Sequence, residues 1–70
     1  MRYAIVVEKT EHNFSAYVPD LPGCVATGKT IEETENEIRE AIKLHMEGLR
    51  EDGLAIPNAV SIVEYLEVAA

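Results

Sequence analysis

The stretch Phe14-Ser15-Ala16-Tyr17-Val18-Pro19-Asp20-Leu21-Pro22-Gly23-Cys24 decides how the chain begins to fold. In its first half, Phe14, Ala16 and Val18 alternate with Ser15 and Tyr17, which is the period-two pattern of a β-strand. The next five residues contain two prolines, which fix φ and remove two amide donors. We therefore predict a strand from Phe14 to Val18, a tight loop, and a short third strand from Cys24 to Thr27 closed by Gly28.

The residues before this stretch predict a hairpin. Tyr3 to Glu8 is rich in Ile and Val, and both of its faces are apolar, which is typical of a central strand covered on two sides. The polar segment Glu11-His12-Asn13 follows, and Asn tolerates the positive φ of a tight turn. We expect the strands over residues 3–8 and 14–18 to pair as an antiparallel hairpin.

The residues after Gly28 predict one amphipathic helix. Thr30 and Glu33 have the spacing of a capping box, in which each side chain bonds the other's backbone amide. Asp52 and Gly53 end the helix, with Gly53 as the expected left-handed cap. A stripe of side chains that would pack on a sheet recurs at helical spacing. It consists of Ile31, Thr34, Ile38, Ala41, Ile42, His45 and Leu49.

The end of the sequence predicts a fourth strand, from Val60 to Val68, after a linking turn at residues 56–58. The element order is then β-β-β-α-β, an α+β domain. A right-handed crossover would place the last strand beside the first and parallel to it. This gives a four-stranded mixed sheet in the order 3-2-1-4, with the helix packed on one face.

The opposite face of such a sheet would stay uncovered. Ala4 and Val6 would point there, joined by either Val63 with Tyr65 or Ile62 with Leu66 from the last strand. An exposed face this apolar is typical of a protein interaction site. We expect the sheet or its edge strand to dock another chain.

Composition favours a single domain that binds another protein. The chain has 70 residues, 47% of them hydrophobic, so it should fold, but a domain this small is often stabilised further by oligomerisation. The net charge is −7, from 13 acidic and 6 basic residues. Nucleic-acid binding depends on Lys and Arg, so direct nucleic-acid binding is disfavoured. A basic protein partner fits the charge, and solubility alone would also explain it.

Other classes of protein are disfavoured by particular residues. Cys24 is the only cysteine, so no disulfide forms within the chain, and nothing has the spacing of a zinc site. The longest apolar runs, such as Ala4 to Val7, are too short to span a bilayer. Met1-Arg2-Tyr3 leads into a strand rather than a signal peptide. We expect one cytoplasmic domain over residues 1–70, without a metal, a cofactor or a membrane contact.

Four residues are candidates for catalysis. His45 lies in the helix stripe, and Cys24 follows Pro22-Gly23, but neither has partners spaced for metal binding or nucleophilic catalysis. A partly buried, hydrogen-bonded histidine and a small buried apolar cysteine are the preferred interpretations. Glu8 and Asp20 lie near the sheet, yet a two-metal nuclease needs several converging acids. We expect no catalytic residue and no enzymatic activity.

The predicted helix offers the best candidate for a binding surface. Its acidic residues outnumber its basic ones and project away from the core stripe. Glu33, Glu37, Glu40 and Leu44 are the candidate partner-binding residues. The alternative is a merely solvated face with one scattered apolar residue.

The stretch 14–24, followed by Ala26, Gly28 and Thr30, resembles the signature of the HicB-like antitoxin domain. The resemblance continues through Glu37-Ile38-x-Glu40-Ala41-Ile42 and Gly53-x-x-Ile56-Pro57, and so covers Tyr3 to about Pro57. It implies a partial ribonuclease H-like fold that lacks the nuclease site. His12-Asn13 stands where the family often has an Asp-Gly-like turn.

The resemblance also implies a function. HicB-like antitoxins bind and neutralise a small basic HicA-type toxin, an mRNA-cleaving ribonuclease with a catalytic histidine, and commonly form dimers or tetramers. Many carry a C-terminal DNA-binding segment, whereas this sequence stops at Ala70. We therefore expect a homo-oligomer with no DNA-binding domain and no direct contact with nucleic acid. The alternative is a solitary homo-oligomeric binding or scaffold module with no toxin partner.

Overall fold

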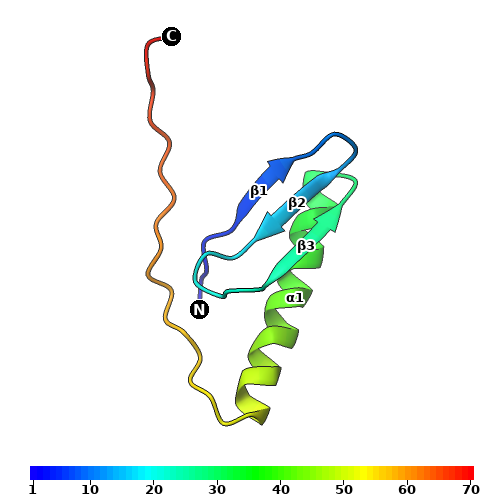
Figure 1. Cartoon of the computed structure of the whole chain (residues 1–70), viewed down its shortest axis with the longest axis vertical. Coiled ribbons are helices and arrows are strands. Elements are labelled where there is room, and N and C mark those ends of the chain that lie inside the picture. The colour runs from blue at the N-terminus through cyan, green and yellow to red at the C-terminus, as the bar shows by residue number, and fades with distance from the viewer.

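A computed structural model describes all 70 residues of the chain. It contains β1 (Val6–Lys9), β2 (Phe14–Tyr17), β3 (Val25–Gly28) and α1 (Ile31–Glu51), in that order (Figure 1). The strands form one antiparallel sheet in the order β1-β2-β3. The α+β class and the three-stranded meander are confirmed, and every strand boundary lies within three residues of its predicted position.

The register of the sheet places one face against α1. Val7 pairs with Ala16, and Ala16 pairs with Ala26. Because side chains directly opposite one another share a face, these three residues lie together, and all three belong to the core or pack against it. The sheet therefore presents small and branched residues to the helix.

The hairpin turn between β1 and β2 is built differently from the prediction. Thr10 and Asn13 close it, through a backbone bond of 2.8 Å from Thr10 N to Asn13 O and a bond of 3.0 Å from Asn13 N to Thr10 Oγ1. Positive φ occurs only at Gly23 and Gly53, so the expected left-handed Asn is not used. The Thr10 hydroxyl satisfies the turn amide instead.

Both ends of α1 follow their predicted signals. Glu33 N donates to Thr30 Oγ1 at 3.0 Å, which is one half of the predicted capping box. At the other end Gly53 has φ +69°, and Leu54 N donates to Leu49 O at 2.8 Å. These bonds satisfy backbone groups that a helix end leaves free.

The core lies between α1 and the sheet, mainly over β3 and β2. It consists of Ala16, Val18, Leu21, Cys24 and Ile38. Leu21 is fully buried although it lies in the proline-rich loop, because that loop folds back on itself. Leu21 N donates to Val18 O at 3.1 Å, and Cys24 N donates to Leu21 O at 3.0 Å.

Within the predicted helix stripe, Thr34 and Ile38 are buried and Ile31 is exposed, while Ala41, Ile42, His45 and Leu49 are half-buried. Ile31 is the first residue of α1, where the helix is only beginning to cross the sheet. The predicted burial of the stripe is therefore correct through most of the helix and wrong at its first residue.

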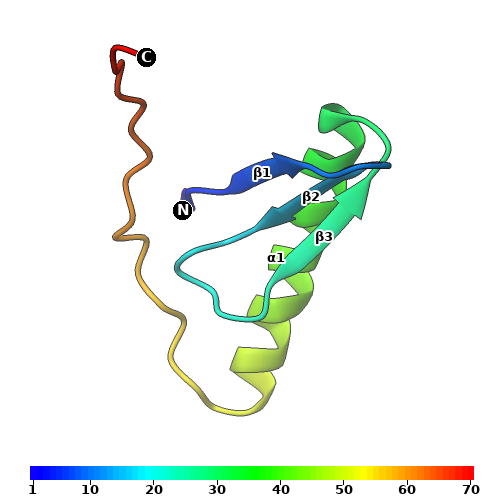
Figure 2. The ribbon, with the colours of Figure 1, turned by 45° about the horizontal axis from the view of Figure 1, so that its top comes forward.

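The predicted fourth strand and the order 3-2-1-4 are wrong for this structure, because residues 54–70 form no helix or strand. We call residues 57–70 the C-terminal segment. It is extended and runs outward from the body of the protein (Figures 1 and 2). Alternating apolar residues favour an extended chain, but they do not specify which edge it pairs with. β1, predicted as a central strand, is consequently an edge strand.

The sheet face opposite α1 is open, as predicted for a sheet with one helix. Val6, Tyr17 and Val25 share a row of the register and lie on this face. Tyr17 and Val25 are exposed and Val6 is half-buried.

Candidate functional site

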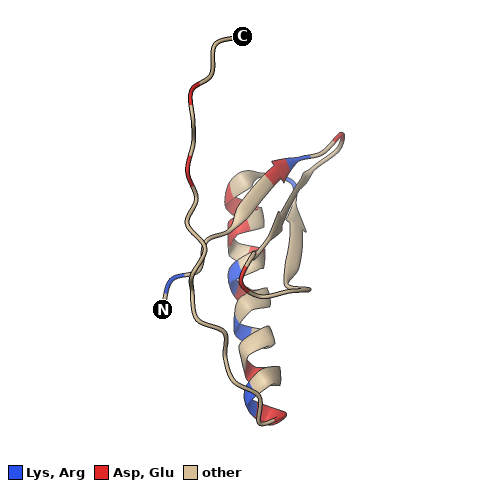
Figure 3. Cartoon of the chain, turned by 60° about the vertical axis from the view of Figure 1, so that its left-hand side comes forward, with Lys and Arg blue, Asp and Glu red and all other residues tan.

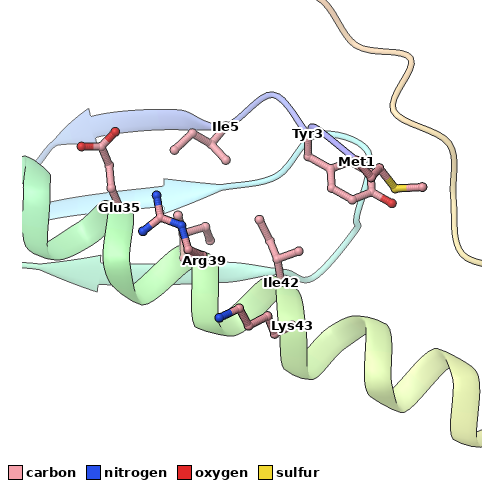
Figure 4. Close-up of a pocket in the computed structure, with 8 residues that line it drawn as sticks. Met1, Tyr3, Ile5, Glu35, Arg39, Ile42 and Lys43 are labelled. Carbon is pink, nitrogen blue, oxygen red and sulfur yellow. The ribbon is translucent and has the colours of Figure 1, made fainter.

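A groove lies beside β1, between the N-terminal residues and α1 (Figure 4). It has a volume of about 280 Å³ and lies between the N-terminal residues and the first half of α1. Its lining residues are Met1, Tyr3, Ile5, Glu35, Ile38, Arg39, Ile42 and Lys43. The groove exists because α1 packs over β3 and β2, which leaves the β1 side of the sheet less covered. It combines an apolar floor with two cations and one acid.

A second hollow lies between the N-terminal residues and the C-terminal segment. It measures about 470 Å³ and is lined by Arg2, Tyr3, Ala4, Ser61, Ile62 and Val63. The C-terminal segment crosses the N-terminal residues here without forming a strand with them.

Asp20 anchors the start of the C-terminal segment. Its carboxylate accepts hydrogen bonds from Val60 N at 3.1 Å, Ser61 N at 3.0 Å and Ser61 Oγ at 2.7 Å. These bonds, chiefly those from Ser61, stabilise the ionised form and lower the pKa of Asp20. The Tyr3 hydroxyl adds a bond of 2.5 Å to Pro57 O. Four hydrogen bonds between residues 40 or more positions apart thus hold this segment.

The four predicted partner-binding residues are all exposed on α1. Glu33, Glu37, Glu40 and Leu44 succeed one another at steps of three or four residues, which places them on one stripe of the helix. We call this set the acidic stripe. Leu44 is 68% exposed, and Glu40 makes an ion pair of 3.2 Å with Lys43. Acidic residues are prominent at the start of α1, with basic residues farther along the helix (Figure 3).

The four candidate catalytic residues do not come together as a site. Cys24 is buried, as expected, and burial raises the pKa of its thiol, which keeps it in the weakly nucleophilic protonated form. His45 is half-buried on α1. Glu8 is exposed near the end of β1, and the Asp20 carboxylate accepts hydrogen bonds from Val60 N and Ser61 N. No group of three or more His, Cys, Asp or Glu side chains could hold a metal ion.

Sequence reasoning missed the structural role of Asp20. The sequence indicates only a carboxylate near the sheet, whereas Asp20 is the contact that directs the C-terminal segment. A short polar side chain in a loop is typical of local turn bonding, and nothing in the sequence pairs it with a serine far along the chain.

α1, the one long helix, is not apolar enough over its length to cross a membrane.

Comparison with known proteins places the whole chain in one family. Residues 3–69 match the model of the HicB_like antitoxin of bacterial toxin-antitoxin systems. A UPF0150 protein of Helicobacter pylori is 42% identical over 65 residues, covering 91% of this chain and 90% of that protein. An uncharacterized 14.9 kDa protein from the rep-hol intergenic region of Haemophilus phage HP1 is 38% identical over 66 residues. The match covers 94% of this chain but only 50% of the phage protein.

The fold is similar to that of a solved toxin-antitoxin assembly. One chain of the "HicA3 and HicB3 toxin-antitoxin complex" superposes with a TM-score of 0.69 and 34% sequence identity. The similarity covers 79% of this chain and 64% of that chain. The match to the family model extends over nearly every residue, including the acidic helix and the C-terminal segment. The chain belongs to the HicB-like antitoxin family of bacterial toxin-antitoxin systems.

Proposed function

We propose that this protein is an antitoxin that binds and neutralises a small basic HicA-type ribonuclease toxin. The observation that carries the proposal is the similarity to a chain of a toxin-antitoxin complex at a TM-score of 0.69 and 34% identity. Membership of the antitoxin family supports the same role. The protein would act in the cytoplasm by covering the toxin, without catalysis of its own.

We assign toxin binding to the acidic stripe. Its three carboxylates would compete with RNA phosphates for the same cations on the toxin, and Leu44 would add an apolar contact beside them. A single exposed ion pair contributes only about 0.2–1 kcal/mol, so affinity depends on several pairs and on desolvation of the contact. The net charge of −7 would accelerate encounter with a basic partner and make the association rate sensitive to salt.

Charge reversal on α1 tests this assignment. The variant Glu37→Lys/Glu40→Lys removes two carboxylates of the acidic stripe, and Glu11→Lys/Glu51→Lys changes the net charge equally at two other exposed positions. We expect the first variant to weaken toxin binding by roughly 10-fold to 100-fold, equivalent to about 1.4–2.8 kcal/mol. The second should bind with little change. The measurement is calorimetric titration with HicA3, or with a HicA-type toxin encoded next to this gene, supported by rescue of growth on co-expression.

The two levels of the proposal have separate outcomes. Equal binding by both variants would show that another surface contacts the toxin. Failure of the unaltered protein to bind either toxin or to restore growth would contradict the antitoxin role itself. Circular dichroism of every variant establishes that the comparison is made between folded proteins.

A further inference from the structure

The groove beside β1 carries an acid and a base that are not paired with each other. Glu35 and Arg39 line it from adjacent turns of α1 (Figure 4). A glutamate four residues before an arginine has the spacing of a stabilising ion pair, yet the one ion pair of the chain joins Lys43 to Glu40. Arg39 Nη1 donates instead to Asn36 Oδ1 at 3.0 Å. The carboxylate of Glu35 and most of the five guanidinium donors of Arg39 are therefore available to a ligand.

Beneath these two charges the groove is aliphatic. Its floor includes Ile5, which precedes β1, and Ile38 and Ile42 of α1. Ile38 is buried in the core, and the other two isoleucines pack against that core. The floor is therefore held in place by the packing of α1 on the sheet. It offers a branched aliphatic surface to the apolar part of a ligand.

The volume of the groove limits the size of the ligand. It measures about 280 Å³, slightly below the roughly 300–1,000 Å³ of pockets that enclose drug-sized molecules. A molecule with one branched aliphatic chain and a small polar head suits this space, whereas a nucleotide or a larger cofactor does not.

Charge selects the polar head of the ligand. A simple carboxylic acid would bring its negative charge beside Glu35, and a simple amine would bring its positive charge beside Arg39. A zwitterion satisfies both, because its carboxylate can accept two parallel bonds from the guanidinium while its ammonium group donates to the glutamate. The Cβ atoms of residues four apart on a helix are about 5–6 Å from each other, a gap that the adjacent charged groups of one small molecule can bridge. Lys43 adds little attraction, because Glu40 already pairs with it.

We propose that this groove binds a free aliphatic α-amino acid, such as leucine, as its zwitterion. Arg39 binds the α-carboxylate, Glu35 binds the α-ammonium group, and the side chain lies on the isoleucine floor. Both charged residues are exposed and each contact contributes modestly, so we expect a dissociation constant of roughly 1 mM. The inference does not rest on toxin binding, because no residue of the acidic stripe lines the groove.

An NMR titration of the full chain, observed through its backbone amides, tests the site with four probes. They are L-leucine, isocaproate, isoamylamine and glycine, so that the last three lack the ammonium group, the carboxylate and the side chain of leucine, respectively. We expect leucine to shift the amides of residues 35–43 and of Ile5, and each other probe to bind at least roughly 10-fold more weakly. Leucine that leaves these amides unshifted at about ten times the expected dissociation constant would overturn the proposal. Isocaproate or isoamylamine binding as well as leucine would do the same, because the groove would then not recognise a zwitterion.

Variants of the two charged residues test their separate roles. We expect Arg39→Gln and Glu35→Gln each to weaken leucine binding by roughly 5-fold to 10-fold. Glu47→Gln and Arg50→Gln are the matched controls, since both positions are exposed on α1 and neither lines the groove, and they should bind leucine as the unaltered protein does.

The analogues separate recognition of the zwitterion from a general loss of binding. Glu35→Gln removes the negative charge that opposes a simple acid, so this variant should bind isocaproate more tightly than the unaltered protein does, although it binds leucine more weakly. The amide spectrum of each variant shows that it is folded. Leucine binding that is unchanged in Arg39→Gln and Glu35→Gln, or weakened equally in the two controls, would overturn the assignment of these residues and with it the proposal.

Discussion

Gly28 lets α1 begin directly after β3. A Cβ atom built at Gly28 would lie 2.6 Å from Thr34 Oγ1 and 2.7 Å from Thr34 N, closer than non-bonded atoms approach. Thr34 is itself fully buried, and its hydroxyl donates to Thr30 O at 2.7 Å. The end of β3 and the first turn of the helix therefore meet across a gap that only glycine leaves open.

We expect Gly28→Ala to lower the free energy of unfolding by about 1–3 kcal/mol, because the added methyl group forces the backbone and the first turn apart. Gly48→Ala is the matched control, since a methyl group at this position in the interior of α1 would meet nothing within 4 Å. That change should raise stability by roughly 0.5–1 kcal/mol through helix propensity. Urea unfolding of both variants measures the difference. A Gly28→Ala protein as stable as the original would show that the close approach is easily relieved.

Asp20 makes the position of the C-terminal segment depend on pH. Its pKa is lowered in the folded protein by the bonds from Ser61 and Val60. Because the pKa is lowered, the bonds to the C-terminal segment favour the ionised form of Asp20. The stabilisation that these bonds give to the anchored segment is complete above the ordinary aspartate pKa of about 3.9, and it is lost as the pH falls through the lowered pKa of the folded protein. The anchored geometry is therefore expected at neutral pH and not in strong acid.

An NMR titration of the Ser61 amide checks this expectation. We expect its shift to report a pKa below the ordinary aspartate value, and Asp20→Asn to abolish that titration. Glu11→Gln, which removes an exposed carboxylate elsewhere, should leave it unchanged. A Ser61 amide that titrates identically in the Asp20→Asn protein would mean that another acid controls the segment.

Among the elements, α1 owes its stability to one face. Ile38 is 2% exposed in the core, whereas Leu44 on the same helix is open to solvent. The helix ends are satisfied locally by Thr30 and Gly53. These features made α1 the most predictable element, because capping residues and helical periodicity are properties of neighbouring positions in sequence.

We expect Ile38→Asp to unfold the domain, with a loss of at least about 4 kcal/mol from the cavity and the buried charge. Leu44→Asp introduces the same side chain on the exposed side and should cost less than about 1 kcal/mol. Far-ultraviolet circular dichroism with thermal unfolding separates the two variants. A folded Ile38→Asp protein would contradict the orientation of α1 against the sheet.

In the molecule as a whole, the sheet is one strand short of the predicted four. The sequence identified Val60–Val68 as strand-forming, and this segment is indeed extended and apolar. Strand propensity alone does not determine whether the segment pairs with an edge of the sheet, because backbone pairing groups are the same in every residue except proline. In the structure Asp20 and Tyr3 hold the start of the segment through side-chain bonds, and it joins no sheet.

The candidate site also has a part that the sequence predicts and a part that only the structure reveals. The exposed positions of Glu33, Glu37, Glu40 and Leu44 were correctly predicted because helical periodicity alone separates them from the core. Their role in binding stays a prediction. The groove beside β1 was not predicted, because it arises from the placement of α1 over β3 and β2 rather than over the whole sheet.

The three strands, the loop after β2, the helix with its caps, and the surplus of acid on the surface could all be read from the order of the amino acids. Each of these follows from side-chain chemistry and from spacing over a few residues. Packing in three dimensions was needed to bring Leu21 into the core, to join Asp20 to Ser61, and to leave β1 with a free edge. These features join residues distant in sequence, and such contacts depend on how the completed elements pack and on which backbone groups that packing leaves unpaired.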